Sequence, residues 1–392
     1  MTDARYSPLH DLHVGLGASF TDFAGWQMPV RYDSDLAEHH AVRERVGMFD
    51  ISHMAEISVN GPQAGEFLDF AVAGKMSALA LGQAKYTLLL TEAGTVIDDL
   101  IIYRLGEEHW LVVANAGNRF AALDALTART AGFTVDVVDQ SDETAMIAVQ
   151  GPSALAVLES TVGLSLAEAA ASRPETTLAD LKYYWTLPAV FEGNPVLIAR
   201  TGYTGEDGFE LYIDAVKAAD LWVTLGEAGE KFGMVPCGLA CRDTLRLEAG
   251  MPLYGHELTL DIRPAQAGLG KVVALSKDGD FVGRAASEKD LPADAPVLVA
   301  LVGEGKRAAR ADYELFVGDE KVGIVTSGAL SPTLGFPVAL AYVHPAHSAV
   351  GHVIDVDVRG TRIPFTVSTL PFYRRKKEIG RASCRERVSS PV

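Results

Sequence analysis

Cysteine is scarce in this chain, with three residues among 392. Cys237 and Cys241 lie four positions apart, and Cys384 lies close to the end, so there is no C-x-x-C motif and no paired framework. This usage predicts reduced thiols in a reducing compartment and excludes a small disulfide-stapled fold.

Long apolar runs and positive charge are also lacking. No stretch approaches the roughly 18 apolar residues of a membrane helix, and the first twelve residues lack a signal-peptide core. The formal net charge is −17, so no general positive field is available to attract phosphates. We therefore expect a cytoplasmic protein without nucleic acid or membrane as a partner, in which an anionic ligand needs a local basic pocket.

Several catalytic motifs are absent as well. There is no P-loop, no G-x-G-x-x-G after a strand and no nucleophile elbow, which argues against nucleotide hydrolysis, dinucleotide redox chemistry and serine hydrolase chemistry. His344, His347 and His352 surround a Pro/Gly-rich loop without a nearby carboxylate, so no metal site is predicted. Residues 378–392 show no periodicity and no apolar face, and we interpret them as a non-native tail.

The length calls for two or three domains, and the patterns predict an α+β body followed by an all-β part. From about residue 297 the chain reads as strands between Gly/Pro turns, which is typical of a small barrel or sandwich. The link before it, 276–294, is charged and weakly patterned. The other elements expected are helices at 35–46, 61–78, 116–131, 215–232 and 239–249, a strand at 48–61, and a three-stranded antiparallel meander at 84–113.

The segment RTGYTGEDGFE, residues 200–210, reads as a tight loop between two strands. Its glycines at 202, 205 and 208 allow positive φ angles or close approach of the backbone to a ligand. Glu210 lies where the chain returns to apolar strand, so we expect it to be drawn inside. A buried carboxylate offers only acceptors and suits a ligand edge with two adjacent N–H groups. A solvated hairpin loop is an equally good interpretation of this segment alone.

Asp98 and Asp99 interrupt the apolar strand VIDDLII. Neighbours on a strand point to opposite faces, so we expect one to face solvent and the other to face core or cleft. A carboxylate in apolar surroundings has a raised pKa, which suits proton transfer, and Tyr86 on the preceding strand could approach the pair. A β-bulge or cap at the strand start is the plainer alternative, and no third ligand for a metal is evident.

A second dense segment, CGLACRDTLRLEAGMPLYG, has a helical pattern that contains Arg242 and Arg246. A partly buried arginine either pairs with a protein acid, here Asp243 or Glu248, or receives an anionic ligand. A structural ion network is the safer interpretation.

Eight segments in order, over residues 7–377, resemble the glycine cleavage system T-protein family: FAGWQMPVRY, HHAVRERVGMFDISHM, IDDL, VQGP, RTGYTGEDGFE, ACRDTLRLEAGMPLYG, TSGALSPTLG and LPFYRR. The resemblance implies an α+β, three-domain cloverleaf around a central folate cleft, with an all-β C-terminal barrel. It implies a folate-binding body at 1–285, with the 54–137 segment inserted, and a barrel at 286–377. The family's enzymes transfer the methylene of an aminomethyl group on lipoylated H-protein to tetrahydrofolate, releasing ammonia and forming 5,10-methylenetetrahydrofolate.

The resemblance also assigns roles to residues. Asp99 matches the family's essential carboxylate, with Asp98 as its support. An arginine after LPFY, Arg374 rather than Arg375, would close the site from the C-terminal domain. The remaining cofactor-binding positions implied are Met54, Tyr86, Asn115, Tyr203, Glu210 and Arg242.

One departure and two alternatives accompany the resemblance. Arg263 and Gln266 stand where the family usually has threonine and glutamate, which could alter a pocket wall or the H-protein contact. The same scaffold serves a tetrahydrofolate-dependent demethylase and a folate-binding non-enzyme. The non-enzyme carries a K-G-C-Y-x-G motif that is absent here, and related dehydrogenases need an N-terminal flavin domain that is also absent.

Overall fold

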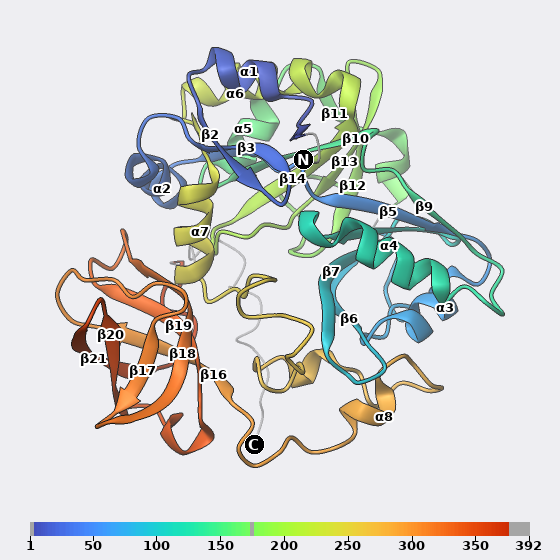
Figure 1. The fold of residues 1–392 in the computed structure, drawn as a ribbon. Helices are drawn as coiled ribbons and strands as arrows, with labels where there is room; N and C mark the ends of the chain where they lie inside the picture. Colours follow the sequence, from blue (N-terminus) through green and yellow to red (C-terminus); the bar gives the residue numbers. More distant parts are fainter. Residues whose placement is uncertain (1–3, 173–175, 376–392) are drawn as a thin grey trace, which may run out of the picture.

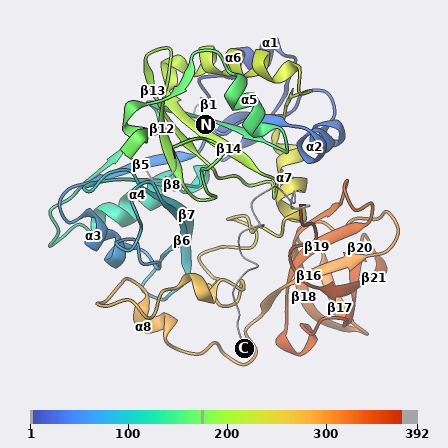
Figure 2. The ribbon, with the colours of Figure 1, turned by 180° about the vertical axis from the view of Figure 1, so that it is seen from behind.

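The computed structural model describes residues 4–172 and 176–375, and the predicted tail at 378–392 lies outside them. Figures 1 and 2 show three lobes around a common centre, with a closed all-β barrel as the third. The predicted α+β cloverleaf with a C-terminal barrel is confirmed. The domain boundary placed near residue 285 stays a prediction.

The first lobe holds a seven-stranded sheet of order β11-β12-β13-β14-β10-β4-β15 and a small sheet of order β1-β3-β2. Its strands are β1 (Arg5–Tyr6), β2 (Ser19–Phe23), β3 (Trp26–Arg31), β4 (Gly47–Asp50), β10 (Thr144–Gln150), β11 (Leu164–Leu166), β12 (Thr186–Phe191), β13 (Asn194–Ala199), β14 (Gly208–Asp214) and β15 (Val235–Pro236). Its helices are α1 (His10–Gly15), α2 (Asp35–Glu44), α5 (Ala154–Ser160), α6 (Ala218–Glu230) and α7 (Leu239–Glu248).

The second lobe is a five-stranded sheet of order β6-β7-β8-β5-β9 with two helices, and the third is the barrel. The second lobe comprises β5 (Ala55–Asn60), α3 (Ala64–Ala71), β6 (Ala84–Leu90), β7 (Val96–Arg104), β8 (His109–Ala114), α4 (Arg119–Ala128) and β9 (Asp136–Asp139). The linker contains α8 (Arg284–Ser287). The barrel strands are β16 (Val297–Gly303), β17 (Glu314–Val317), β18 (Glu320–Leu330), β19 (Pro337–Val343), β20 (Val353–Val358) and β21 (Thr361–Ser368).

Strand β10 shows how the two sheets share a core. Successive side chains alternate between the faces of a strand. Ile147 accordingly packs into the cluster that includes α5 and α6. Met146 and Ala148 join a second cluster with Val113 of β8 and Tyr212 of β14. The seven-stranded sheet therefore lies between its helices and the five-stranded sheet, and a cavity lies between the two sheets.

Two expected elements differ from the structure. The chain at 48–61 is not one strand, because it turns at Ile51–Met54 and passes from β4 in one sheet to β5 in the other. The helix expected at 61–78 covers only α3, since Val72 is extended and ends it. The meander at 84–113 is confirmed as β6-β7-β8. The weakly patterned link is irregular apart from α8.

Helix α7 joins the barrel to the first lobe through one buried carboxylate. Glu248, at its last turn, accepts hydrogen bonds from Ser331 and from Thr333 of the barrel's 331–336 turn. Arg43 of α2 pairs with Glu248 at 2.9 Å and with Glu206 at 2.9 Å. Burial alone would raise the pKa of Glu248, but hydrogen bonds from His39, Ser331 and Thr333 lower it to about 2.

No helix in the described part of the chain combines the length and the apolar character needed to cross a membrane.

The buried arginine supplies the first test of this architecture. We expect Arg43→Met to lower the free energy of unfolding by about 3 kcal/mol, because it leaves Glu206 and Glu248 buried beside no guanidinium. Urea denaturation at neutral pH measures the change. Arg45→Met is the matched control, since Arg45 follows directly after α2 and its guanidinium makes an exposed contact with Gly233. Equal stabilities for the two variants would contradict the interpretation.

Candidate active site

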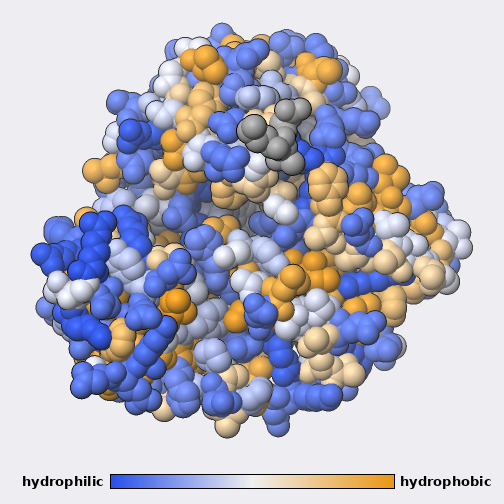
Figure 3. Space-filling view, viewed as in Figure 1, coloured by the Kyte–Doolittle hydropathy of each residue, from blue (hydrophilic) through white to orange (hydrophobic). Residues whose placement is uncertain are grey.

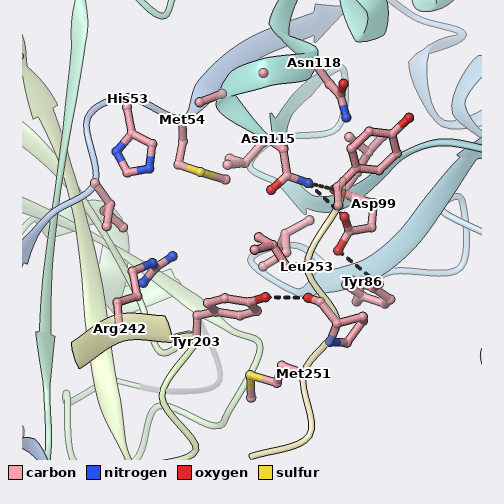
Figure 4. Close-up of a pocket in the computed structure, with 18 of the residues that line it drawn as sticks. His53, Met54, Tyr86, Asp99, Asn115, Asn118, Tyr203, Arg242, Met251 and Leu253 are labelled. Atoms are coloured by element: carbon pink, nitrogen blue, oxygen red, sulfur yellow. Dashed lines mark hydrogen bonds between the residues drawn. The ribbon is translucent and has the colours of Figure 1, made fainter. Parts of the chain in front are cut away.

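A cavity of about 520 Å³ lies between the two sheets, beside α7 and the 250–256 segment. Figure 3 shows a recess near the centre of the molecule, where the lobes meet, and Figure 4 shows the lining side chains. Seven of the nine predicted site residues line this cavity: Met54, Tyr86, Asp99, Asn115, Tyr203, Glu210 and Arg242. Residues from distant parts of the sequence are therefore brought together as the resemblance implies.

A β-bulge in β7 lies directly before Asp98 and Asp99. Leu89 of β6 pairs with Asp98, and Leu90 pairs with Val96, so Ile97 is an extra residue in β7. A bulge bends a strand and re-aims the side chains beside it. Asp99 lines the cavity, and Asp98 is fully buried behind it. The structure thus places Asp98 in the core and the partly exposed Asp99 in the cavity, and the bulge offered as the plainer alternative is present at the same point of the strand.

Asn115 holds both carboxylates. Its side-chain nitrogen donates to Oδ1 of Asp98 and to Oδ1 of Asp99, each at 2.8 Å. Its backbone N–H donates to the other oxygen of Asp98 at 2.9 Å, and Asn118 donates to Asp98 at 2.6 Å. Tyr86 donates its hydroxyl to Asp99 at 3.1 Å. The pair is thus fixed by neutral donors, and no lysine, arginine or histidine among the described residues forms an ion pair with it.

The pair titrates close to neutrality. Burial, with the neighbouring Asp99 carboxylate, raises the pKa of Asp98 to about 7. Burial raises the pKa of Asp99 to about 6, although Tyr86 and Asn115 act in the opposite direction. Two adjacent carboxyls in a weakly solvated site share protons, so the pair carries one negative charge over part of the physiological range. This state can both accept and donate a proton.

Glu210 lies on the facing sheet and is 6% exposed, as predicted. Thr201 donates a hydrogen bond to it, and burial raises the pKa of its carboxyl. Tyr212 donates to Tyr103, whose hydroxyl lies 3.4 Å from that of Thr201. The carboxylate therefore presents its remaining acceptor capacity to the cavity.

The glycine-rich loop before Glu210 is built around Gln150. A Cβ on Gly202 would lie 2.0 Å from Oε1 of Gln150, and one on Gly208 would lie 2.4 Å from Nε2. Gly205 has φ +80°, a conformation that favours glycine. At Gly202 and Gly208 the space that a Cβ would need is thus occupied by Gln150, and Gly202 also lines the cavity. Gln150 belongs to the VQGP segment and is completely buried.

The third wall comes from α7 and the segment after it. Arg242 stacks over the Tyr203 ring, with 4.9 Å from its guanidinium carbon to the ring centroid. Tyr203 donates its hydroxyl to the backbone oxygen of Pro252. Arg242 has no ion-pair partner among the described residues, and its Nη1 is buried without a hydrogen bond. The safer interpretation of a structural ion network holds for Arg246, which pairs with Asp243 and Glu257, but not for Arg242.

Three further predicted positions lie outside the lining of the cavity. Arg374 is exposed, and its role in closing the site stays a prediction. Arg263 donates to backbone oxygens of the linker at Ala286, Lys289 and Asp290. Gln266 donates to the backbone oxygen of Pro296. Arg263 therefore binds the linker, Gln266 binds the residue before β16, and neither lines this cavity.

Potential metal ligands gather elsewhere. Within residues 4–172 and 176–375, the only trio close enough to share an ion is Glu38, Cys237 and Cys241, which is buried and outside the cavity. Nδ1 of His347 lies 3.2 Å from Nε2 of His352, and neither residue belongs to such a trio among the described residues.

Sequence reasoning missed two site residues. His53 lines the cavity beside Met54, and Asn118 fixes Asp98. The adjacency of His53 to Met54 in the segment DISHM was a usable signal. Asn118 gave none, because it comes near Asp98 only through the pairing of β7 with β8 and the turn that follows.

Comparisons with known proteins agree over almost the whole chain. The family described as "GCVT N-terminal domain" matches residues 9–277, and the "Glycine cleavage T-protein C-terminal barrel domain" matches residues 297–374. A Cutibacterium acnes protein named aminomethyltransferase is 56% identical, with 96% of this chain and 100% of that protein covered. One of the same name from Streptomyces coelicolor is 52% identical, with 96% and 99% covered. The crystal structure of glycine cleavage system aminomethyltransferase T from Bartonella henselae has a TM-score of 0.84 at 36% identity, with 95% and 99% covered.

The raised pKa values predict how stability depends on pH. A carboxyl whose folded-state pKa lies above its unfolded value contributes stability below about pH 4, which is lost as the pH rises through 6 to 7. We expect Asp99→Asn, which keeps an acceptor for Asn115, to be more stable than the wild type by about 1 kcal/mol at pH 8 and not at pH 4. Chemical denaturation at both pH values measures this. Asp290→Asn on the exposed linker should show no such difference, and a destabilised Asp99→Asn at pH 8 would refute the account.

Proposed function

This chain belongs to the glycine cleavage T-protein family and has its aminomethyltransferase activity, and we propose that the central cavity binds tetrahydrofolate as co-substrate. The lipoyl arm of a partner H-protein presents the aminomethyl group there. Its methylene passes to tetrahydrofolate, ammonia is released and 5,10-methylenetetrahydrofolate forms. We place the reaction in the cytoplasm, which the free thiols of the two cysteines in the described residues, Cys237 and Cys241, favour.

The observation that carries the proposal is the pairing of a proton-sharing carboxyl dyad with an acceptor-only carboxylate in one cavity. The pterin ring presents its 2-amino group and the adjacent ring N–H side by side, and Glu210 can accept from both. The cavity volume of about 520 Å³ is within the range of small-molecule sites. The residues present therefore fit tetrahydrofolate.

The reaction requires protons to move as bonds change. A bond forms from the methylene carbon to each of two folate nitrogens, while the carbon–sulfur bond and the bond to the departing nitrogen break. The two folate nitrogens lose one proton each, and the sulfur and the ammonia gain one each. Asp99 faces the cavity, so we assign it the uptake of the proton from the attacking nitrogen.

The neighbours of Asp99 determine its orientation. Tyr86 and Asn115 each donate to one of its oxygens, which fixes the plane of the carboxylate. Asp98 shares Asn115 with Asp99 and, by holding a proton more tightly, leaves the negative charge on Asp99. Met54 and Tyr203 supply apolar surface for the pterin, and Arg242 supplies positive charge in a strongly acidic protein. Arg374 is proposed to close the site on the anionic tail.

The direct test is ammonia release from aminomethyl-loaded H-protein, with and without tetrahydrofolate. We expect folate-dependent release by the wild type and a loss of about 10²-fold or more in Asp99→Asn, because the amide cannot take up the proton. Tetrahydrofolate binding, measured by calorimetry, should persist in the variant. If the wild type binds tetrahydrofolate tightly but releases no ammonia, the transfer proposal falls.

The pH dependence of transfer gives a second test. Since proton uptake needs the ionised form of Asp99, kcat/KM for tetrahydrofolate should rise as the pH increases through about 6 and then level off. Steady-state kinetics at saturating loaded H-protein measures the profile. An acidic limb that persists unchanged in the residual activity of Asp99→Asn would assign the titration to another group.

A further inference from the structure

His53 is a cavity residue with no role in the chemistry described so far. It lies in the turn between β4 and β5, next to Met54, and the imidazole is 3% exposed. Figure 4 shows it on the same side of the cavity as Arg242, across from Asp99 and Tyr86. The Phe23 ring packs edge-on against it, at 5.4 Å between ring centroids. The imidazole is therefore fixed in the wall that lies opposite the reacting end.

One nitrogen of His53 is left without a partner. Nδ1 is buried and makes no hydrogen bond. An orphaned acceptor is tolerated more often than an orphaned donor, so the tautomer with its proton on Nε2 is favoured. Because Nδ1 is sealed off and the ring lines the cavity, Nε2–H is the group that faces a ligand.

His53 is neutral at physiological pH. Burial, together with the guanidinium of Arg242, lowers its pKa to about 4, although Asp50 acts in the opposite direction. A neutral imidazole with a proton on Nε2 donates one hydrogen bond into the cavity and does not compete with Arg242 for an anion.

The polar groups on this wall form a pattern. Glu210 offers only acceptors, and the guanidinium of Arg242 offers only donors. Glu210, Arg242 and His53 all line this cavity, and Figure 4 draws His53 and Arg242 on one side of it. Nη1 of Arg242, like Nδ1 of His53, is buried without a hydrogen bond, so the remaining nitrogens of the two groups are the ones that can face a ligand. A ligand edge that matches this wall has N–H donors adjacent to a carbonyl acceptor.

We propose that His53 and Arg242 together read the 4-oxo group of the pterin and reject a 4-amino group at the same position. The proposal rests on tetrahydrofolate being the ligand. With the 2-amino group and the ring N–H on Glu210, the adjoining 4-oxygen is the acceptor that the two donors require. A 4-amino group would place N–H donors against donors, and such unpaired polar groups discriminate strongly in a closed site.

The measurement is the ratio of dissociation constants for tetrahydrofolate and its 4-amino counterpart, tetrahydroaminopterin, by calorimetry on the full chain. We expect the wild type to prefer the 4-oxo compound by about tenfold or more. His53→Leu should reduce this preference by about threefold to tenfold, mainly through weaker binding of tetrahydrofolate. A selectivity ratio is the appropriate readout because general loosening of the cavity weakens both compounds alike.

Two polar variants locate the responsible nitrogen. A glutamine amide can place an N–H near the position of Nε2, and an asparagine amide near that of Nδ1. We expect His53→Gln to keep the ratio within about threefold of the wild type and His53→Asn to resemble His53→Leu. His40→Leu, at a half-buried histidine of α2 outside the cavity, is the control for replacing a histidine by leucine.

The outcomes separate the two proposals. An unchanged ratio in His53→Leu and His53→Asn overturns the role of His53, even if the wild type transfers the methylene normally. Equal binding of the two compounds by the wild type overturns it as well. Failure of the wild type to bind tetrahydrofolate at all defeats the proposed function, and the reading of the 4-oxo group with it. Loss of selectivity in His53→Leu and His53→Asn, with retention in His53→Gln, supports the assignment.

Discussion

The architecture of the site depends on keeping two adjacent carboxylates away from bulk water without a cation beside them. Such a pair repels itself, and burial penalises both charges. The structure meets this constraint with neutral donors, because Asn115 reaches both acids while Asn118 and Tyr86 each reach one. The remaining repulsion keeps a proton on the pair near neutrality. The burial that raises the pKa values of the two aspartates, and so suits them to proton transfer, therefore also lowers the stability of the fold above neutral pH.

The opposite wall follows a different rule. Glu210 is a single carboxylate whose partner in the protein is a hydroxyl, and Arg242 stacks on a ring without meeting an acid. The other buried arginines that the structure describes near the lobe junction, Arg43 and Arg246, are paired with carboxylates. The contrast between paired and unpaired charges separates the groups that hold the lobes together from the groups that are left for a ligand.

Much of this could be predicted from the sequence where the signal is local. The meander at 84–113, the aspartate pair and the inward position of Glu210 follow from patterns within a few residues. The turn at Ile51–Met54 could not be predicted, because the apolar alternation of 48–61 continues through it while the partner sheets change. The one local signal for His53 is its adjacency to Met54 in this turn. The glycines at 202 and 208 predict close approach to a ligand, whereas the atoms that a Cβ would meet there belong to Gln150, which lies 52 positions away in the first case.

The two ends of helix α7 contact different parts of the molecule. Near its start Arg242 faces the cavity, and six residues later Glu248 is bound by the barrel and by α2. Six helical residues span about 9 Å along a rigid rod. The same helix therefore both contacts the barrel and forms part of the cavity wall. We therefore expect a shift of the barrel to reach the guanidinium of Arg242 through this helix, so that substitutions in the 331–336 turn, which does not line the cavity, change binding there.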